Sequence, residues 1–264
     1  MNSDSTGNTS TNDATGPTGP TCPTDPAGPT STNDATSPAD SANPTDSAGP
    51  TNPTDSAAFW ESHYAGVDPQ WGTRPNAVLA EVVTALVPAP GVGGRALDLG
   101  CGHGGDALWL ASLGWDVTAV DVSATALERV AAGAAASGLA DRVHPDRHDL
   151  ARSFPGGTFD LVTASYFHTP VEIPRDQVLR RAAAAVAPGG LLVLVEHASL
   201  APWSWRDGHE DVRFPTPDEV RTSLRLDDGW HTERCVAPER TATGPGGETA
   251  TVTDNVIAVR RRPA

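Results

Sequence analysis

The sequence predicts an α/β fold in which a doubly wound sheet of about seven strands carries helices on both faces, preceded by a disordered tail. Three observations predict it: a tail without bulky apolar residues, alternating strand and helix patterns after it, and a glycine-rich turn after the first strand. The sheet is expected to be mostly parallel, because strand–helix–strand connections run successive strands in one direction. An antiparallel hairpin near the C-terminus is expected to close the sheet edge.

The chain divides into a tail, residues 1–57, and one domain, residues 58–264. The tail consists almost entirely of Ser, Thr, Asn, Asp, Gly, Pro and Ala, with no aromatic residue. Such a segment buries too little apolar surface to offset the entropy cost of ordering, so we expect it to be disordered. The remaining part, about 200 residues, suits a single α/β domain.

Charge and targeting signals limit the expected partners. The chain has a formal net charge of −15 and contains no lysine, so no basic stripe for nucleic acid is visible. Neither a secretory signal nor an apolar run long enough to cross a bilayer is visible. The three cysteines lack paired spacing, so no metal site is expected. We therefore expect a cytoplasmic protein with a small-molecule partner, without nucleic acid or membrane; monomer and homodimer both stay open.

Hydrophobic periodicity places the elements in order. Apolar residues at helical spacing predict helices, and short β-branched or continuous apolar runs predict strands. The first helix ends at Pro88, and Ser123 is a good N-cap for a later one. The predicted elements are a helix at 76–87, a strand at 95–99, a helix at 106–113, a strand at 116–120, a helix at 124–137, strands at 142–147 and 159–163, a helix at 177–186, a strand at 191–195, a helix at 216–224, and final strands near 231–237 and 251–259, with a glycine-rich turn at 243–247.

The turn after the first strand carries the most specific motif. Gly100, Gly102 and Gly105 satisfy G-x-G-x-x-G between a strand and a helix. Asp121 follows about twenty residues later, at the end of the second strand, where it can accept hydrogen bonds from ribose hydroxyls. The glycines let the backbone approach a nucleotide, and the helix N-terminus after Gly105 can receive a carboxylate. This pattern alone also describes a dinucleotide-binding fold.

Asp98 separates the two cofactor classes. It lies two positions before Gly100, and a carboxylate at the mouth of the turn would repel a pyrophosphate but attract the ammonium group of a methionine moiety. The residues therefore favour S-adenosylmethionine (SAM). An NAD-dependent oxidoreductase and a non-catalytic SAM-binding protein stay open as alternatives.

A series of segments resembles the motifs of class I SAM-dependent methyltransferases, which have a Rossmann-like fold. The segments are 98–104, 117–123, Asp149-Leu150, 159–162 and 188–191. The segment 59–64, followed by Trp71 and Arg74, is similar to the branch that holds the tellurite-resistance and thiopurine methyltransferases. The resemblance implies methyl transfer from SAM to a small-molecule acceptor, with a thiol or a chalcogen oxyanion as one candidate. The Pro-Pro-aromatic segment of nucleic-acid methyltransferases is absent after the fourth strand.

The resemblance also implies a cofactor site. Its members come from the entry segment, the glycine turn and the strand ends: Trp71, Arg74, Asp98, Gly100, Cys101, Gly102, Asp121, Val122, Asp149, Leu150 and Ser165. Among them, Asp98 would face the methionine end, Asp121 the ribose and Asp149 the adenine amino group. Arg74 could pair with the methionine carboxylate, and Cys101 is expected to be only a small residue in a crowded turn.

Catalytic residues are weakly marked, because the cofactor supplies the reactivity and the protein mainly aligns the nucleophile. His168 is the candidate base or orienting group, since neutral imidazole can accept a proton near pH 7. Tyr166 is the second candidate and is expected to wall the pocket. For both residues a purely structural role is the alternative. The irregular stretch 201–214, with Trp203 and Trp205, is long enough to cover a substrate.

Overall fold

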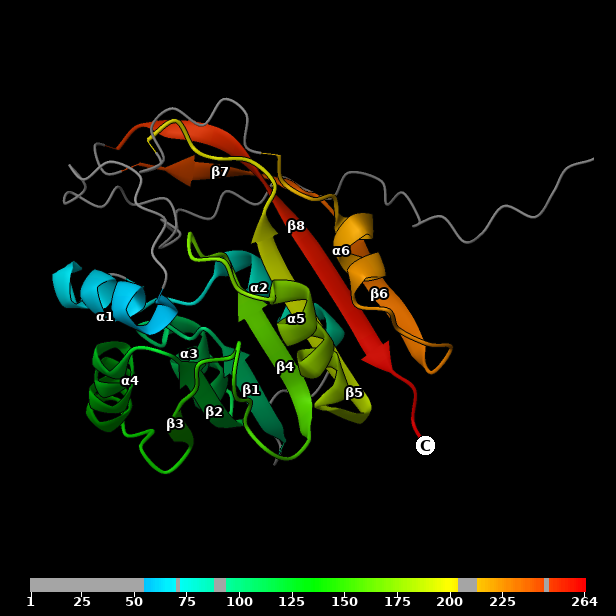
Figure 1. The fold of residues 1–264 in the computed structure, drawn as a ribbon, viewed down its shortest axis with the longest axis horizontal. Helices are drawn as coiled ribbons and strands as arrows, with labels where there is room; N and C mark the ends of the chain where they lie inside the picture. Colours follow the sequence, from blue (N-terminus) through cyan, green and yellow to red (C-terminus); the bar gives the residue numbers. More distant parts are fainter. Residues whose placement is uncertain (1–54, 70–71, 88–93, 204–212, 245–246) are drawn as a thin grey trace, which may run out of the picture.

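The computed structural model describes residues 55–69, 72–87, 94–203, 213–244 and 247–264. The predicted tail up to residue 54, Trp71 and residues 204–212 of the expected cover, with Trp205, lie outside the described residues. Figure 1 shows one sheet with helices packed against it. Within the described ranges, no helix is long and apolar enough to span a membrane.

The elements alternate as the sequence predicts. The strands are β1 (Arg95–Leu99), β2 (Asp116–Asp121), β3 (Val143–Arg147), β4 (Phe159–Ser165), β5 (Val186–His197), β6 (Trp230–Val236), β7 (Glu239–Thr243) and β8 (Thr249–Arg261). The helices are α1 (Ser56–Gly66), α2 (Ala77–Leu86), α3 (Gly105–Ser112), α4 (Ala124–Ala136), α5 (Arg175–Ala184) and α6 (Pro217–Ser223). The predicted helices and strands are thus all present, with shifts at their ends.

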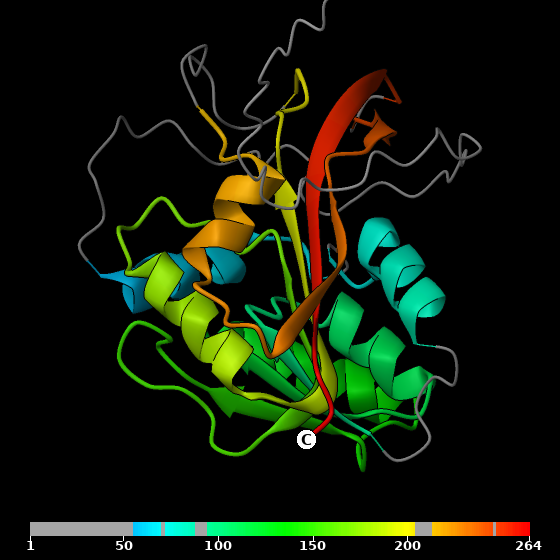
Figure 2. The same cartoon turned by 90° about the vertical axis from the view of Figure 1, so that its right-hand side faces the viewer.

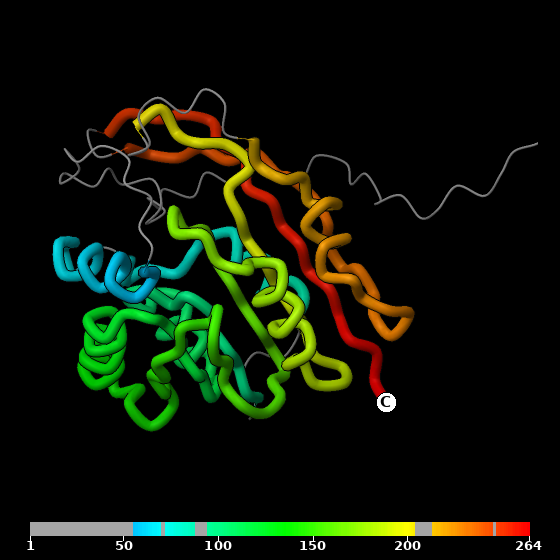
Figure 3. Tube along the Cα trace, in the orientation of Figure 1, coloured from blue at the N-terminus to red at the C-terminus, as the bar shows by residue number. Residues whose placement is uncertain are grey.

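The described strands form an eight-stranded sheet in the order β3-β2-β1-β4-β5-β8-β6, with β7 paired to β8. The strands β1 to β5 pair in parallel, and the pairs made by β8 are antiparallel. The predicted mostly parallel sheet with antiparallel C-terminal strands is confirmed. The eighth strand is β7, a mostly polar segment before the glycine-rich turn that the sequence analysis does not place as a strand of its own. Figure 3 shows β8, in red, running between β5 and β6 instead of along the edge.

Helices cover both faces of the sheet, as Figure 2 shows edge-on. Leu79 of α2, Leu110 of α3 and Val130 of α4 pack in one buried cluster with inward residues of β1 and β2. Leu179 of α5 and Val220 of α6 pack in a second cluster on the opposite face. The helices leave the carboxyl ends of the parallel strands accessible. Open α/β sheets bind their ligands at this edge.

Helix α1 is not among the predicted elements, and it begins two residues before the predicted domain boundary at residue 58. Its side chains show no continuous apolar stripe, and Tyr64 is its one buried residue. The sequence does hold a start signal, because the Asp55 side chain accepts hydrogen bonds from the amides of Ala57 and Ala58. The contacts of α1 with α4 and the glycine turn, described below, hold it at the carboxyl edge of the sheet.

Candidate functional site

The glycine turn adopts a backbone that side chains rarely allow. Gly100, Gly102 and Gly104 have φ values of 67°, 51° and 85°, which lie in the left-handed region. A Cβ at Gly100 would lie 2.8 Å from the Phe167 ring, and one at Gly102 would lie 2.9 Å from the Tyr64 hydroxyl. The turn therefore needs glycine both for its dihedral angles and for the close approach of neighbouring side chains.

Cys101 lies half-buried in this turn. Its amide donates to the carbonyl of Val120, which fastens the turn to β2. Burial raises the pKa of the Cys101 thiol well above its ordinary value, and the nearby Asp121 and Asp98 carboxylates add to the shift. A neutral thiol is a poor nucleophile, so the geometry fits the expected role of a small residue in a crowded turn.

Asp121 joins the end of β2 to the turn. Its carboxylate accepts hydrogen bonds from the amides of Gly102 and Ser123, each at 3.0 Å. Burial raises the pKa of Asp121, whereas these two amide hydrogen bonds act in the opposite direction. The side chain thus lies at the turn, where the sequence predicts it.

Asp98 is 2% exposed, at the carboxyl end of β1. One carboxylate oxygen accepts a 2.8 Å hydrogen bond from the Thr163 hydroxyl, and the other oxygen, Oδ2, is buried without a hydrogen-bond partner. Burial raises the pKa of Asp98 to about 8, with a further contribution from the neighbouring Asp106 carboxylate. Because an unpaired buried carboxylate oxygen is costly, the site favours a ligand that donates hydrogen bonds or carries positive charge.

Asp106, in the first turn of α3, is the third acid of this group. The Asp106 carboxylate accepts a 2.6 Å hydrogen bond from the backbone amide of Asn76, and burial raises the pKa of Asp106. None of Asp98, Asp106 and Asp121 forms an ion pair with a described basic residue. We call these three residues the acid cluster. A cationic ligand would stabilise the ionised forms of these acids, whereas an anionic pyrophosphate would disfavour them further.

The segment before α2 covers the start of α3. The amide of Gly105 donates to the carbonyl of Gly72, and a Cβ at Gly105 would lie 2.1 Å from the Arg74 carbonyl oxygen. The amide of Gly105, the first residue of α3, is therefore bonded within the protein, and the carboxylate site expected at this helix N-terminus stays a prediction. Arg74 itself is exposed and is not among the residues that line the pocket described next.

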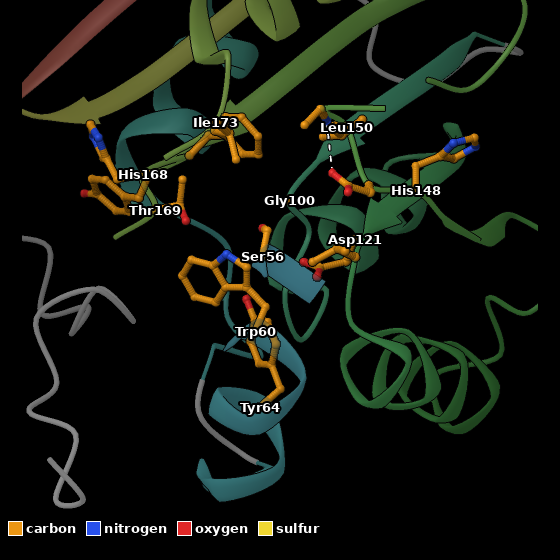
Figure 4. A pocket seen from close by; sticks show the side chains of 15 residues that line it. Ser56, Trp60, Tyr64, Gly100, Asp121, His148, Leu150, His168, Thr169 and Ile173 are labelled. Carbon is orange, nitrogen blue, oxygen red and sulfur yellow. Dashed lines mark hydrogen bonds between the residues drawn. The ribbon is translucent and has the colours of Figure 1, made fainter. Parts of the chain in front are cut away.

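A pocket opens beside the turn, with about 580 Å³ of empty volume when its open mouth is included. Of the predicted site residues, those that line it are Gly100, Asp121, Val122, Asp149, Leu150, Tyr166 and His168. Figure 4 shows Asp121 and His148 on one side of the pocket and His168 and Thr169 on the other. The structure thus brings together residues that are up to 68 positions apart in the sequence, from Gly100 to His168.

Four other predicted residues do not line the pocket. Asp98, Cys101 and Gly102 belong to the strand end and turn that carry Gly100. Ser165 ends β4, and its hydroxyl is buried without a hydrogen-bond partner. These four residues are not part of the pocket lining, and Trp71 lies outside the described residues.

The sequence reading misses the wall that α1 provides. Ser56, Trp60 and Tyr64 line the pocket (Figure 4). The available signal is the segment 59–64, which holds the first aromatic residues after the tail. The apolar residues of that segment do not recur at helical spacing. The segment therefore resembles a motif of the family, but a helix that lines the pocket could not be predicted from it.

Glu61 fastens α1 to the start of α4. Its carboxylate accepts hydrogen bonds from the Ser123 hydroxyl at 2.8 Å and from the Thr125 hydroxyl at 2.6 Å. The Thr125 and Ser123 hydroxyls lower the pKa of Glu61 to about 2. Glu61 is therefore ionised at neutral pH and holds α1 over the glycine turn.

On the far side of the pocket, Tyr166 and His168 follow β4. The Tyr166 ring stacks on the imidazole of His197, with centroids 4.0 Å apart and planes 9° apart. The imidazole of His168 also lies near His197, with ring centroids 5.8 Å apart. Trp203, from the expected substrate cover, packs instead against Ala242 and Val252 of the C-terminal hairpin. The pocket thus has a polar, aromatic end opposite Asp121.

Part of the chain resembles known methyltransferases. Residues 96–190 match the protein family described as "Methyltransferase domain". The chain is 36% identical over 117 residues to the ribosomal RNA small subunit methyltransferase C of Alcanivorax borkumensis, a match covering 43% of this chain and 35% of that protein. It is 32% identical over 149 residues to the ubiquinone biosynthesis O-methyltransferase of a Caulobacter species, covering 51% and 59%. The chain spans about a third to three-fifths of the length of these two curated relatives.

Solved structures share the fold. One, described as the conversion of a disulfide bond into a thioacetal group during echinomycin biosynthesis, superposes with a TM-score of 0.57 at 24% identity and covers 78% of this chain and 93% of that chain. TehB from Haemophilus influenzae superposes with a TM-score of 0.54 at 15% identity, covering 71% and 62%.

Proposed function

We propose that the chain is a class I SAM-dependent methyltransferase that transfers the methyl group of SAM to a small-molecule acceptor, since residues 96–190 match a methyltransferase domain. The observation that carries this proposal is the buried, unpartnered Oδ2 of Asp98 within the acid cluster. The ammonium group of a methionine moiety would supply the missing hydrogen-bond donor together with a positive charge. A pyrophosphate would instead add negative charge beside three carboxyl groups, which argues against a nicotinamide cofactor.

The residues of the pocket would hold the cofactor from two sides. Asp121 would accept hydrogen bonds from the ribose hydroxyls, since each carboxylate oxygen has lone pairs beyond those used by Gly102 and Ser123. Asp149 and Leu150 line the same side and would face the adenine, with Val122 packed beside them. Trp60 and Tyr64 of α1 would exclude water from that part of the pocket.

When bound, SAM supplies an electrophilic methyl group on a sulfonium. The task left to the chain is to align the acceptor and keep water away. His168, at the end of the pocket opposite Asp121, would orient the acceptor or accept its proton. Tyr166 would form the wall at that end. A soft acceptor, such as a thiolate or a chalcogen oxyanion, is ionised already and would need no general base, which keeps this class among the candidates.

The primary experiment is calorimetric titration of the full chain with SAM, S-adenosylhomocysteine and NADH. We expect binding of the first two ligands and no response to NADH. Tight NADH binding without a response to SAM would overturn the proposal in favour of the oxidoreductase alternative.

Transfer of a radiolabelled methyl group then tests turnover across thiols, phenols, selenite and tellurite. Ribosomal RNA is added as a further acceptor because the chain resembles a ribosomal RNA methyltransferase over 117 residues. The formal charge of −15 disfavours RNA, so we expect label on a small acceptor. Label on RNA alone would contradict the small-molecule proposal, and SAM binding without any labelled product would favour a non-catalytic SAM-binding protein.

A further inference from the structure

The C-terminal hairpin, β7 and β8, reaches the acceptor end of the pocket although it lies outside residues 96–190, which match the methyltransferase family. Asp254 of β8 is fully buried and pairs with His197 of β5 in the sheet register. Its Oδ2 accepts a 2.6 Å hydrogen bond from Nε of Arg240 on β7. Because this ion pair is buried, its geometry is well defined and sensitive to removal of either partner.

The pair holds the Tyr166 hydroxyl. This hydroxyl donates to Asp254 Oδ2 and accepts from the Arg240 guanidinium, both at 3.1 Å. The hydroxyl hydrogen and one lone pair of Tyr166 are therefore engaged in hydrogen bonds within the protein. Tyr166 consequently offers the pocket its ring and not a free hydroxyl, so a role as proton acceptor does not fit this geometry.

The backbone of Tyr166 needs such support. Its φ is 48°, a left-handed conformation that bulky residues rarely adopt. The Tyr166 amide donates to the Val195 carbonyl, and the Tyr166 carbonyl accepts from the His168 amide at 2.6 Å. The tight turn after β4 thus links the position of the Tyr166 ring to that of His168.

We propose that Arg240 and Asp254 are positioning residues for the acceptor end of the pocket. They hold the Tyr166 ring in place and support the left-handed backbone of this residue. Through the turn after β4, they also position His168 at the pocket. The role at an acceptor site rests on the proposed function. The dependence of the Tyr166 position on Arg240 and Asp254 can be measured without cofactor or acceptor.

The chain has only two tyrosines, Tyr64 and Tyr166, so fluorine NMR of protein labelled with 3-fluorotyrosine gives two signals. The variant Tyr64→Phe assigns them. We expect Arg240→Gln and Asp254→Asn each to shift or broaden the Tyr166 signal in the ligand-free protein. The matched control is Arg234→Gln, which removes an arginine paired with Glu81 at a more exposed site. This control should leave the Tyr166 signal in place. A Tyr166 signal unchanged in both test variants, with melting temperatures near that of the wild type, would overturn the inference.

Kinetics with the best acceptor from the radiolabel panel give a second readout. Arg240→Gln should lower kcat by about tenfold through misalignment, with the Kd for S-adenosylhomocysteine changed less than about twofold. Tyr166→Phe combined with Arg240→Gln should lose no more than the larger single variant, because both act through one contact. Additive losses would contradict the inference. If the protein binds no SAM, the proposed function is refuted. The fluorine NMR result then decides separately whether Arg240 and Asp254 position Tyr166.

Discussion

At the scale of single residues, the acid cluster distinguishes this site from a dinucleotide-binding one. Asp121 is partnered by two backbone amides and Asp106 by one, whereas Asp98 keeps an unpartnered oxygen. The three carboxyl groups thus differ in what they can still bind. The strongest ligand-dependent change is expected at Asp98.

Cofactor affinity should depend on pH through Asp98. Burial and Asp106 raise the pKa of Asp98 to about 8 in the ligand-free protein, whereas a bound ammonium group stabilises the carboxylate. A proton must therefore leave on binding below pH 8, so affinity should rise with pH by up to about tenfold per unit and level off above. Titration of S-adenosylhomocysteine in buffers of different ionisation enthalpy measures the released proton.

The control for this pH dependence is Asp98→Asn, which cannot titrate. It should weaken binding and remove the slope between pH 6 and pH 8. A wild-type affinity that is flat across this range, or a slope that persists in Asp98→Asn, would show that another group titrates.

Asp121→Ala should lower SAM affinity at least about tenfold, or about 1.4 kcal/mol. The substitution removes the expected ribose acceptor and also leaves the amides of Gly102 and Ser123 without their partner. Calorimetry measures the affinity, and a melting curve of the same variant separates lost contacts from unfolding. Unchanged affinity would mean that the ribose lies elsewhere.

At the scale of elements, helix α1 completes the pocket. It supplies Trp60 and Tyr64, and Glu61 attaches it to the hydroxyls of Ser123 and Thr125. Ser123 also caps α4, and its amide donates to Asp121. The attachment of α1 and the acid that we propose as the ribose acceptor therefore share one turn. The helix is therefore expected to respond to cofactor binding.

Glu61→Ala should release α1 from α4. Hydrogen exchange of the α1 amides should become faster, and the Kd for S-adenosylhomocysteine should rise, since one wall of the pocket is then loose. The Thr125→Val variant removes one of the same hydrogen bonds and should give a smaller effect in the same direction. Faster exchange spread equally over α5 would indicate general destabilisation and contradict a local attachment.

The low pKa of Glu61 gives the attachment a pH dependence. Since its pKa is about 2 in the folded protein and 4.5 as the ordinary value, its contribution to stability is present above about pH 4.5 and is lost as the pH falls toward 2. The side chain lies near the surface, so solvent screening limits the energy involved.

At the scale of the whole molecule, the composition of residues 1–54 predicts that the domain folds without them. We expect a chain that starts at Thr54 to keep its melting temperature and its SAM affinity. Removal of Asp55 as well should cost about 1 kcal/mol, because the N-cap of α1 is then lost. Thermal unfolding of both truncated chains tests this, and a large loss on the first truncation would refute the expected disordered tail.

The sequence by itself determined the strand and helix alternation, the glycine turn and the placement of Asp98 and Asp121 at strand ends. These features follow from local rules, namely hydrophobic period, cap chemistry and the need for glycine at positive φ. The turn also pointed to the cofactor class, because Asp98 and the glycines are close in the sequence.

Tertiary structure decided what the local pattern does not contain. The wall formed by α1 depends on Glu61 meeting residues about sixty positions away, and the place of β8 between β5 and β6 depends on strand pairing. The same holds for Tyr166, whose hydroxyl is held by Arg240 and Asp254 from the far end of the chain. Contacts between distant residues leave no periodic pattern in a sequence. The proposed SAM site could therefore be predicted from local motifs, whereas the arrangement around Tyr166 depends on the fold.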